Sequence, residues 1–168
     1  MIEYVKNTYC SYCGAVFTMA TWPRHCVICD NTTWQNPLPV VVVMARVCPN
    51  LNSYSSSYIL IRRSIPPQVG ELAFPGGYLD MGETWREGAA RELREETGTS
   101  VSPERIQFHE MITSPVSSNL VIFCKVDVDW DEVNFVPNDE VSGLYLAFNP
   151  TELAFPSHTE QLKRALNG

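Results

Sequence analysis

The sequence predicts an α/β protein in which helices flank a mixed β-sheet, preceded by a small cysteine-rich segment. Three observations support this fold class. Apolar and β-branched runs alternate with two helical patterns, which is typical of a sheet covered by helices. Two prolines close together near residue 37 separate this region from the segment before it. That segment contains four cysteines in two pairs.

The junction Asn36-Pro37-Leu38-Pro39 is expected to divide the chain into two domains. Prolines hold the chain extended and disfavour a helix. Residues 1–36 are too few to bury a core of their own, whereas the whole chain of 168 residues, 45% of them hydrophobic, suffices for one full domain. We therefore expect a small domain over residues 1–36 and a larger one over residues 37–168.

Two strands open the larger domain. Residues 40–47 are continuously apolar and mostly β-branched, as in a strand that is covered on both faces. Residues 49–57 form a polar loop rich in Ser and Asn, and residues 58–63 have the composition of a second strand. The two strands are therefore predicted to form a hairpin with a long loop.

The strongest helix signal covers residues 84–97. Thr84 and Glu87 form a capping-box pattern at its start. Gly98 occupies the place where a left-handed residue ends many helices. Between these ends, alanine, leucine, glutamate and arginine predominate, and all four are good helix formers.

Three more strands and a second helix complete the pattern. Residues 106–112, 120–128 and 141–148 have the composition of strands. Ser157 and Glu160 form a second capping-box pattern, which predicts a helix from Ser157 to the C-terminus.

The charge and the N-terminus argue against several classes of protein. Nineteen acidic and twelve basic residues give a net charge of −7, the wrong sign for general binding to a nucleic-acid backbone. The N-terminus lacks the pattern of a secretory signal, and the longest apolar stretch is too short to span a membrane. We therefore expect a cytoplasmic protein whose cysteines are reduced thiols or metal ligands.

Four cysteines predict a structural zinc site. They form two Cys-x-x-Cys pairs separated by twelve residues, and four thiolates complete the tetrahedral coordination of Zn²⁺ with no open position. The predicted ligands are Cys10, Cys13, Cys26 and Cys29. The alternative is four unrelated core or redox cysteines, which the paired spacing disfavours. His25 is expected to lie on the surface, and Cys48 and Cys124 are expected to be small core residues.

Three glutamates of the predicted helix suggest a second metal site. Glu92, Glu95 and Glu96 stand at positions i, i+3 and i+4, on one helical face. Their mutual repulsion favours a bound cation, and carboxylate oxygens suit Mg²⁺ or Mn²⁺. Glycines before the helix let the backbone come close, so the carbonyl of Gly76 is a further candidate ligand. Taken alone, the charge pattern is more typical of a solvated helix face, with Arg91 neutralising it.

The spacing between this helix and the loop before it favours the metal site. Residues 77–98 match the pattern G-x5-E-x7-R-E-U-x-E-E-x-G, in which U is a bulky apolar residue. The matching positions are Gly77, Glu83, Arg91, Glu92, Leu93, Glu95, Glu96 and Gly98. This pattern resembles the Nudix box. The apolar residue that ends the box is replaced by Thr99, and Val101 is expected to supply its contact.

The resemblance implies a Nudix-type α/β/α sandwich with a mixed sheet over residues 37–168. The cysteine pairs and the junction after them are similar to the zinc ribbon of a Nudix subgroup that acts on ADP-ribose, FAD or NADH. An enzyme is therefore implied, a Nudix hydrolase that cleaves a nucleoside diphosphate linked to a second moiety. We expect a dinucleotide-type substrate, cleaved to AMP and a phosphorylated product. Residues 153–157 resemble the tail of plant FAD and ADP-ribose pyrophosphatases, whereas the Ser-Gln-Pro-Trp motif of the NADH pyrophosphatases is missing.

The resemblance also assigns roles to residues of the box. The implied ligands of Mg²⁺ or Mn²⁺ are Gly76, Glu92, Glu95 and Glu96. Among these, Glu95 would bind directly or through water. Glu83 and Arg91 would form a supporting pair that holds the loop against the helix.

The general base is less well defined. Nudix enzymes often recruit it from a loop beyond the box, where Asp139 and Glu140 are the candidates. The alternative is that these two residues form only a solvated turn. Gly143 occupies a position where a glutamate would be expected, which leaves Glu95 and Glu96 as further candidate bases.

The sequence gives few signals for the residues that contact substrate. Arg62 and Arg63 end the second strand near the expected phosphate position, although strand-end arginines more often face solvent. Phe74, Tyr78 and Trp34 are candidates for stacking on a base or flavin ring, although aromatic residues more often pack internally. The expected partner is a small nucleotide diphosphate. Homodimers are common in the family, and the sequence leaves the oligomeric state open.

Two other functions are also consistent with the sequence. A sanitising enzyme would convert a modified nucleoside triphosphate to a monophosphate and pyrophosphate, so its products would differ from those of a dinucleotide hydrolase. A non-catalytic adaptor would bind a protein through the ribbon and sense a nucleotide. The complete set of carboxylates argues against the adaptor.

Overall fold

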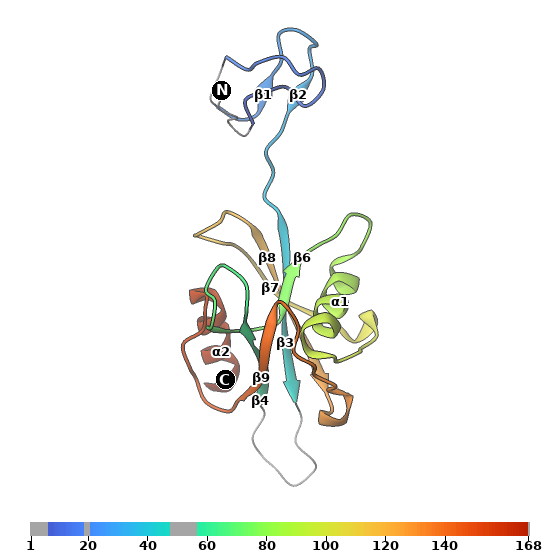
Figure 1. The fold of residues 1–168 in the computed structure, drawn as a ribbon, viewed down its shortest axis with the longest axis vertical. Helices are drawn as coiled ribbons and strands as arrows, with labels where there is room; N and C mark the ends of the chain where they lie inside the picture. Colours follow the sequence, from blue (N-terminus) through green and yellow to red (C-terminus); the bar gives the residue numbers. More distant parts are fainter. Residues whose placement is uncertain (1–6, 19–20, 48–56, 168) are drawn as a thin grey trace. The chain divides into compact units, whose positions relative to one another are not determined.

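The computed structural model describes residues 7–18, 21–47 and 57–167 (Figure 1). The chain divides into two compact units, Met1–Pro37 and Leu38–Gly168, and each is treated separately below. Cys48 and most of the predicted polar loop, residues 49–56, lie outside the described residues. None of the helices in the described ranges has the length and apolar character that a membrane span requires.

The first unit is organised around the two cysteine pairs. Strand β1 (Arg24–His25) pairs antiparallel with β2 (Thr32–Thr33). In both pairs the N–H four residues after the first cysteine donates to the carbonyl of that cysteine at 2.9 Å. Among the described residues of this unit, the buried ones are Cys10 and Cys26. Backbone turns around cysteines, rather than an apolar core, therefore build this unit.

The second unit contains a seven-stranded mixed sheet. Its strands are β3 (Pro39–Val47), β4 (Ser57–Arg63), β5 (Leu72–Ala73), β6 (Gly76–Tyr78), β7 (Gln107–Thr113), β8 (Leu120–Val128) and β9 (Val141–Ala147). The strand order is β5-β4-β3-β8-β7, with β6 paired to β3 and β9 paired to β4. β3 and β8 are parallel, and the other pairs are antiparallel. The predicted mixed sheet is confirmed.

Helix α1 (Trp85–Thr97) has the predicted ends. The hydroxyl of Thr84 accepts the N–H of Glu87 at 3.3 Å, and the carboxylate of Glu87 accepts the N–H of Thr84 at 2.7 Å. Gly98 ends the helix in the left-handed conformation, with φ of 70°. The capping box and the glycine C-cap are therefore both confirmed.

Helix α2 (Pro156–Asn167) begins one residue earlier than predicted. Pro156 is its first helical residue. The fixed φ of proline suits the helix at this position, and the missing N–H costs no hydrogen bond because the first N–H groups of a helix have no intrahelical acceptor. Ser157 therefore lies inside the first turn. The prediction that Ser157 caps this helix with Glu160 is wrong.

The two helices cover opposite faces of the sheet (Figure 1). On one face, Val41 of β3 lies in a buried cluster with Leu93 of α1. On the other face, Val42 lies in a second cluster with Leu162 of α2. Strand β3 is thus covered on both faces, as its apolar sequence predicts, and the α/β/α sandwich is confirmed.

The remaining differences from the predicted elements are small. Strands β3 and β4 form the predicted antiparallel pair, but only next to their connection, because β6 pairs with the first half of β3. Ser57, predicted to end the loop, begins β4 and is buried. Two short 3-10 helices, η1 (Pro103–Arg105) and η2 (Trp130–Glu132), were not predicted. Cys124 is fully buried in β8, as predicted.

Candidate functional site

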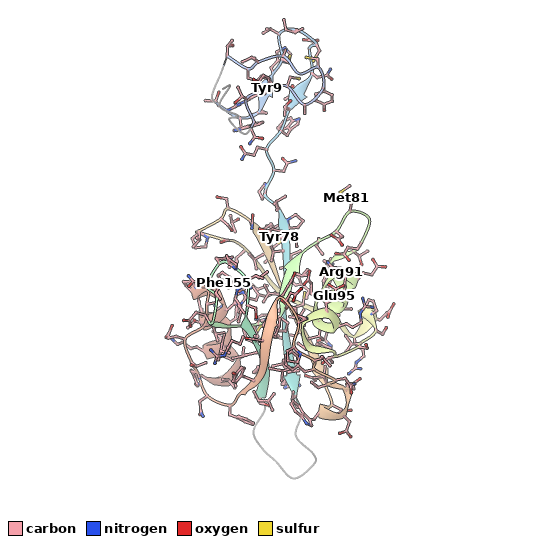
Figure 2. The ribbon with its side chains drawn as sticks, viewed as in Figure 1. Tyr9, Tyr78, Met81, Arg91, Glu95 and Phe155 are labelled. Atoms are coloured by element: carbon pink, nitrogen blue, oxygen red, sulfur yellow. The ribbon has the colours of Figure 1, made fainter. Side chains whose placement is uncertain are left out.

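Two of the three box glutamates are buried between helix α1 and the sheet. Glu92 is 9% exposed and Glu96 is 6% exposed, one helical turn apart. The side chain of Glu95 is 50% exposed. Figure 2 labels Glu95 and Arg91 on α1. The structure thus brings Glu92 and Glu96 together as a buried pair and leaves Glu95 at its exposed edge.

Strand β6 reaches the buried pair through two glycines. The N–H of Gly76 donates to Oε2 of Glu96 at 2.7 Å. A Cβ at Gly77 would lie 2.4 Å from Oε1 of Glu92, so a side chain at this position would displace the carboxylate. The first glycine of the box therefore lets the backbone of β6 approach both glutamates. Gly76, the predicted carbonyl ligand, lies on the strand that borders them.

Burial makes both carboxylates difficult to ionise. It raises the pKa of Glu96 to about 8, opposed by the N–H of Gly76 and reinforced by the charge of Glu92. Burial also raises the pKa of Glu92, opposed by the hydrogen bond and charge of Arg91. The nearby arginines offset this burial only in part, and a bound cation would favour the ionised form of both carboxylates further.

Arg91 joins the box loop to the helix. Its Nη2 and Nε atoms donate to Oε1 and Oε2 of Glu83 at 2.7 and 3.1 Å. Nη1 donates to Glu92 at 2.8 Å and to Glu95 at 3.1 Å, and Nη2 also donates to the carbonyl of Tyr78 at 3.0 Å. Hydrogen bonding between Arg91 and Glu83 raises the pKa of the arginine and lowers that of the glutamate. The loop and the helix are thus held together by one guanidinium.

The buried pair and the nearby backbone suit a hard divalent cation. Carboxylate and carbonyl oxygens are the ligands that Mg²⁺ prefers, and Mn²⁺ accepts the same set. In the structure these carboxylates hold hydrogen bonds from Arg91 and Gly76 instead. Within the described ranges, the cysteines are the group whose ligand atoms already lie within 4.8 Å of one another.

Glu140, a predicted base, lies in the turn directly before β9. The N–H of Ser64, just after β4, donates to the carbonyl of Glu140 at 2.7 Å. The negative charge of Glu140 contributes to the raised pKa of both Glu92 and Glu96. Glu140 is also exposed, so water can reach it.

The two strand-end arginines differ in their surroundings. Arg62 donates to the hydroxyl of Tyr145 at 3.0 Å and to the carbonyl of Gly70 at 2.5 Å, and its guanidinium lies 4.8 Å from the centroid of the Tyr145 ring. The charge of Arg63, in contrast, lowers the pKa of Glu96. Arg63 is also bonded locally: its Nε donates to the carbonyl of Pro67 at 2.8 Å, and its guanidinium lies 5.4 Å from the centroid of the Phe155 ring.

Phe74 is part of the core. Its ring is 2% exposed, with centroids 6.2 Å from Tyr58 and 5.8 Å from His158. The prediction that Phe74 contacts substrate is therefore corrected, because its ring packs internally. Tyr78 is 55% exposed and Trp34 is 64% exposed, so both are accessible to a ligand.

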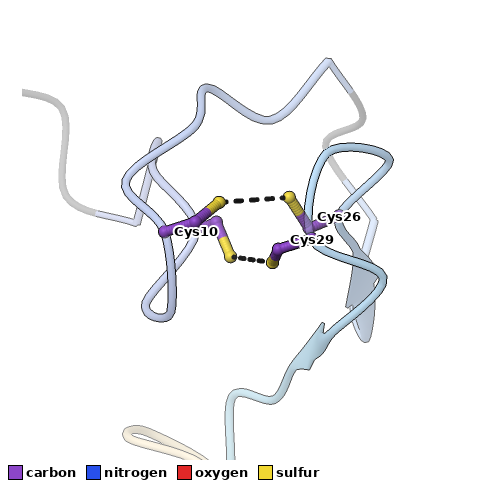
Figure 3. A group of neighbouring side chains, drawn as sticks. Cys10, Cys26 and Cys29 are labelled. Carbon is purple, nitrogen blue, oxygen red and sulfur yellow. Dashed lines mark hydrogen bonds between the residues drawn. The ribbon is translucent and has the colours of Figure 1, made fainter.

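The four predicted zinc ligands converge in the first unit (Figure 3). The Sγ atoms of Cys10 and Cys29 are 3.7 Å apart, as are those of Cys13 and Cys26. Four sulfurs placed about 2.3 Å from a tetrahedral zinc ion would be about 3.8 Å apart. Both measured distances match this value, and all four sulfurs lie within 4.8 Å of one another, so the group suits Zn²⁺.

One neighbour of the cysteines favours the thiolate form of Cys29. The amide of Asn31 donates to Sγ of Cys29 at 3.5 Å and lowers the pKa of that thiol, which favours the thiolate form that binds metal. His25 lies outside the cluster and contacts Asp30 at 3.1 Å. His25 is exposed, as predicted.

Sequence reasoning missed two groups that border the glutamates. The carbonyl of Tyr78 accepts a hydrogen bond from Arg91, and no side-chain pattern can reveal a backbone acceptor. Asn138 donates to the carbonyl of Glu95 at 2.9 Å. Here a signal was available, because asparagine just before a strand is typical of a turn closed by its side chain.

Comparison with known proteins identifies the family. Residues 40–166 match the family model described as NUDIX domain. A curated relative from Photorhabdus laumondii subsp. laumondii, the NAD-capped RNA hydrolase NudC, is 22% identical over 158 residues, which cover 93% of this chain and 58% of the relative. The chain therefore spans little more than half the length of that relative.

Solved structures show the same fold. A NUDIX hydrolase from Nitrosomonas europaea has a TM-score of 0.71 and 22% identity, covering 95% of this chain and 90% of the other. The NUDIX domain of Shewanella oneidensis NrtR, solved with ADP ribose, has a TM-score of 0.64 and 18% identity, covering 80% and 89%. The family model itself matches most of the chain. This chain belongs to the NUDIX domain family.

Proposed function

We propose that this protein hydrolyses the pyrophosphate bond of a dinucleotide-type substrate, with ADP-ribose, FAD and NADH as the candidates, to release AMP and a phosphorylated product. The observation that carries the proposal is the buried pair Glu92 and Glu96 beside β6. Their raised pKa values favour a divalent cation, which a protein of net charge −7 also needs in order to hold a diphosphate.

The metal ligands in this proposal come from two elements. Glu92 and Glu96 of α1 would hold Mg²⁺ or Mn²⁺, with the carbonyl of Gly76 on β6 and the carboxylate of Glu95 completing the protein ligands. When bound, such an ion withdraws charge from the phosphate oxygens and lowers the pKa of the attacking water.

The other residues position groups and move a proton. Glu83 and Arg91 hold the loop and the helix in register, so that ligands from the two elements stay at a fixed separation. Glu140 is exposed beside the buried pair and would accept the proton of the attacking water. Displacement at phosphorus leaves the protein mainly the tasks of positioning and charge stabilisation, which suits these side chains.

The comparisons support the substrate class. The relative from Photorhabdus is a NAD-capped RNA hydrolase, and the NUDIX domain from Shewanella was solved with ADP ribose. NAD and ADP-ribose both contain a nucleoside diphosphate linked to a further group. The cysteine cluster would hold a structural Zn²⁺, which contributes to folding of the first unit rather than to the reaction.

A substrate panel with Mg²⁺ and with Mn²⁺, followed by identification of products, tests the proposal. A dinucleotide should give two monophosphates. A monophosphate with pyrophosphate from a triphosphate would identify a sanitising enzyme instead, and nucleotide binding without metal-dependent turnover would identify an adaptor. Neither of these last two outcomes is compatible with the proposal.

A variant at Glu96 tests the assignment of the site. Glu96→Gln removes one buried carboxylate, so we expect kcat to fall by about a hundredfold or more while the fold is retained. Glu160→Gln is the matched control, because it removes the same charge from the exposed surface of α2. Near-normal turnover of Glu96→Gln would refute the placement of the site.

A further inference from the structure

The C-terminal end of helix α1 is bonded to a loop distant in sequence. The last four carbonyls of a helix have no intrahelical partner, and the carbonyl of Glu95 is one of them. Nδ2 of Asn138, 43 residues further along the chain, donates to this carbonyl at 2.9 Å. A side chain from the loop before β9 therefore caps the helix one residue from Glu96.

The same side chain also shapes its own loop. Oδ1 of Asn138 accepts the N–H of Glu140 at 2.9 Å and the N–H of Val141 at 2.8 Å. The N–H of Asn138 donates to the carbonyl of Val141 at 3.0 Å. One amide group thus closes the turn that carries Glu140 and, at its other end, bonds this turn to α1.

Other contacts hold the loop in the same place. The N–H of Ser64 donates to the carbonyl of Glu140 at 2.7 Å, which fixes that residue against the end of β4. A Cβ at Gly98 would lie 2.1 Å from the carbonyl oxygen of Asn134, so the loop also lies directly on the helix terminus. Glu140 is therefore located between the end of α1 and the end of β4.

We propose that Asn138 is a positioning residue that fixes Glu140 beside Glu92 and Glu96 by bonding its loop to the end of α1. The inference rests on the proposed function, in which Glu140 accepts a proton. Asn138 is exposed, so its main effect is on geometry rather than on burial. A misplacement of a reacting group by about 1 Å can cost about a hundredfold in rate.

A double-mutant cycle tests whether Asn138 acts through Glu140. The variants are Asn138→Ala, Glu140→Gln and both together, compared by kcat with Mg²⁺ on the substrate that the panel identifies. We expect Asn138→Ala to lower kcat by about ten- to a hundredfold when Glu140 is present, and by less than about twofold when it is absent. Equal losses in both backgrounds would overturn the inference, because the effect would then be independent of Glu140.

Asn134→Ala is the matched control. Asn134 is an exposed asparagine of the same loop whose side-chain amide donates within the loop, to the carbonyl of Glu132 at 3.5 Å, rather than to α1. We expect this variant to retain kcat. A loss equal to that of Asn138→Ala would indicate general sensitivity of the loop and would also overturn the inference.

Amide hydrogen exchange gives a readout that does not depend on activity. In the metal-free protein, Asn138→Ala should speed exchange of the amides of Glu140 and Val141, whereas Asn134→Ala should leave both unchanged. Unchanged exchange in Asn138→Ala would overturn the inference. Absence of any metal-dependent turnover in the unmodified protein would instead overturn the proposed function. The exchange result reports on the loop alone, so it distinguishes failure of this inference from failure of the proposed function.

Discussion

The backbone of Gly77 lies directly against the carboxylate of Glu92. A Cβ at Gly77 would stand 2.4 Å from Oε1 and 2.7 Å from the carboxylate carbon. The same oxygen of Glu92 accepts a hydrogen bond from Arg91 at 2.8 Å. A strand, a helix and a guanidinium therefore determine the position of this carboxylate together.

Gly77→Ala should displace Glu92 and weaken the metal site. The added methyl group overpacks the contact between β6 and α1, which costs about 1–3 kcal/mol of stability. We expect kcat to fall by about a hundredfold and the affinity for Mn²⁺, measured by titration calorimetry, to fall with it. Gly70→Asn is the control, because open space surrounds Gly70 and asparagine tolerates its positive φ. Unchanged affinity in Gly77→Ala would contradict the prediction.

Without divalent cations, the contribution of Glu96 to the stability of the protein should fall between about pH 4.5 and pH 8. The pKa of Glu96 rises from 4.5 to about 8 on folding, so in this range the folded protein binds more protons than the unfolded chain. The contribution of this group to the free energy of unfolding must then decrease as the pH increases. Glutamine does not titrate, so Glu96→Gln should flatten this dependence.

Urea unfolding at pH 5 and pH 8, in buffer without Mg²⁺ or Mn²⁺, measures the effect. Glu160→Gln should keep the slope of the unmodified protein, because its carboxylate is exposed. Adding Mg²⁺ at pH 8 should stabilise the unmodified protein more than Glu96→Gln. If the free energy of unfolding changed equally with pH in Glu96→Gln and in the unmodified protein, the prediction would be wrong.

Arg91→Lys should uncouple the loop from the helix. Lysine cannot bond both oxygens of Glu83 while also reaching Glu92 and Glu95. Since the side chains of Arg91 and Glu83 are mostly buried, we expect a loss of about 1–3 kcal/mol and a lower kcat. Thermal and urea unfolding measure the first effect, and steady-state kinetics the second.

Arg94→Lys is the control for this variant. The side chain of Arg94 is 60% exposed and contacts Glu95 at 3.8 Å, so we expect a change within about 0.5 kcal/mol. If the two lysine variants had equal stability, the coupling assigned to Arg91 would be wrong.

Chelation of zinc should expose four thiols together. The four cysteine sulfurs lie within 4.8 Å of one another, so loss of a shared ion would release all of them. A thiol reagent added with a chelator should detect four new reactive groups, while Cys124 stays protected in the core. A Cys48→Ser background removes the remaining cysteine from the count. Release of two thiols or fewer would rule out the four-cysteine site.

The long elements of the fold were predictable because they carry periodic signals. The strands of seven or more residues lie within one residue of their predicted ends, and α1 has caps that can be read locally. β5 and β6 were not predicted, because two or three residues are too few to show a periodic pattern. The start of α2 was predicted one residue too late. Ser157 and Glu160 match a capping pattern, but the helix already begins at Pro156.

The site was predictable where chemistry depends on spacing along the chain. The cysteine pairs and the glutamates of α1 satisfy that condition. Phe74 and Arg62 do not, because their availability depends on packing: one ring is buried, and one guanidinium is bonded to Tyr145 and Gly70. The approach of Asn138 to α1 depends on the path of a loop, which spacing alone does not determine.

The five hydrogen bonds that Arg91 donates to described residues have a consequence for motion. The loop and the helix are both bonded to the guanidinium of Arg91, so they cannot shift independently. They will therefore move as one rigid unit during turnover. Any adjustment to ligands of different size must then occur outside these two elements, for example in the turn after β4. Substrate range can therefore diverge in such a turn while the loop and the helix keep their positions.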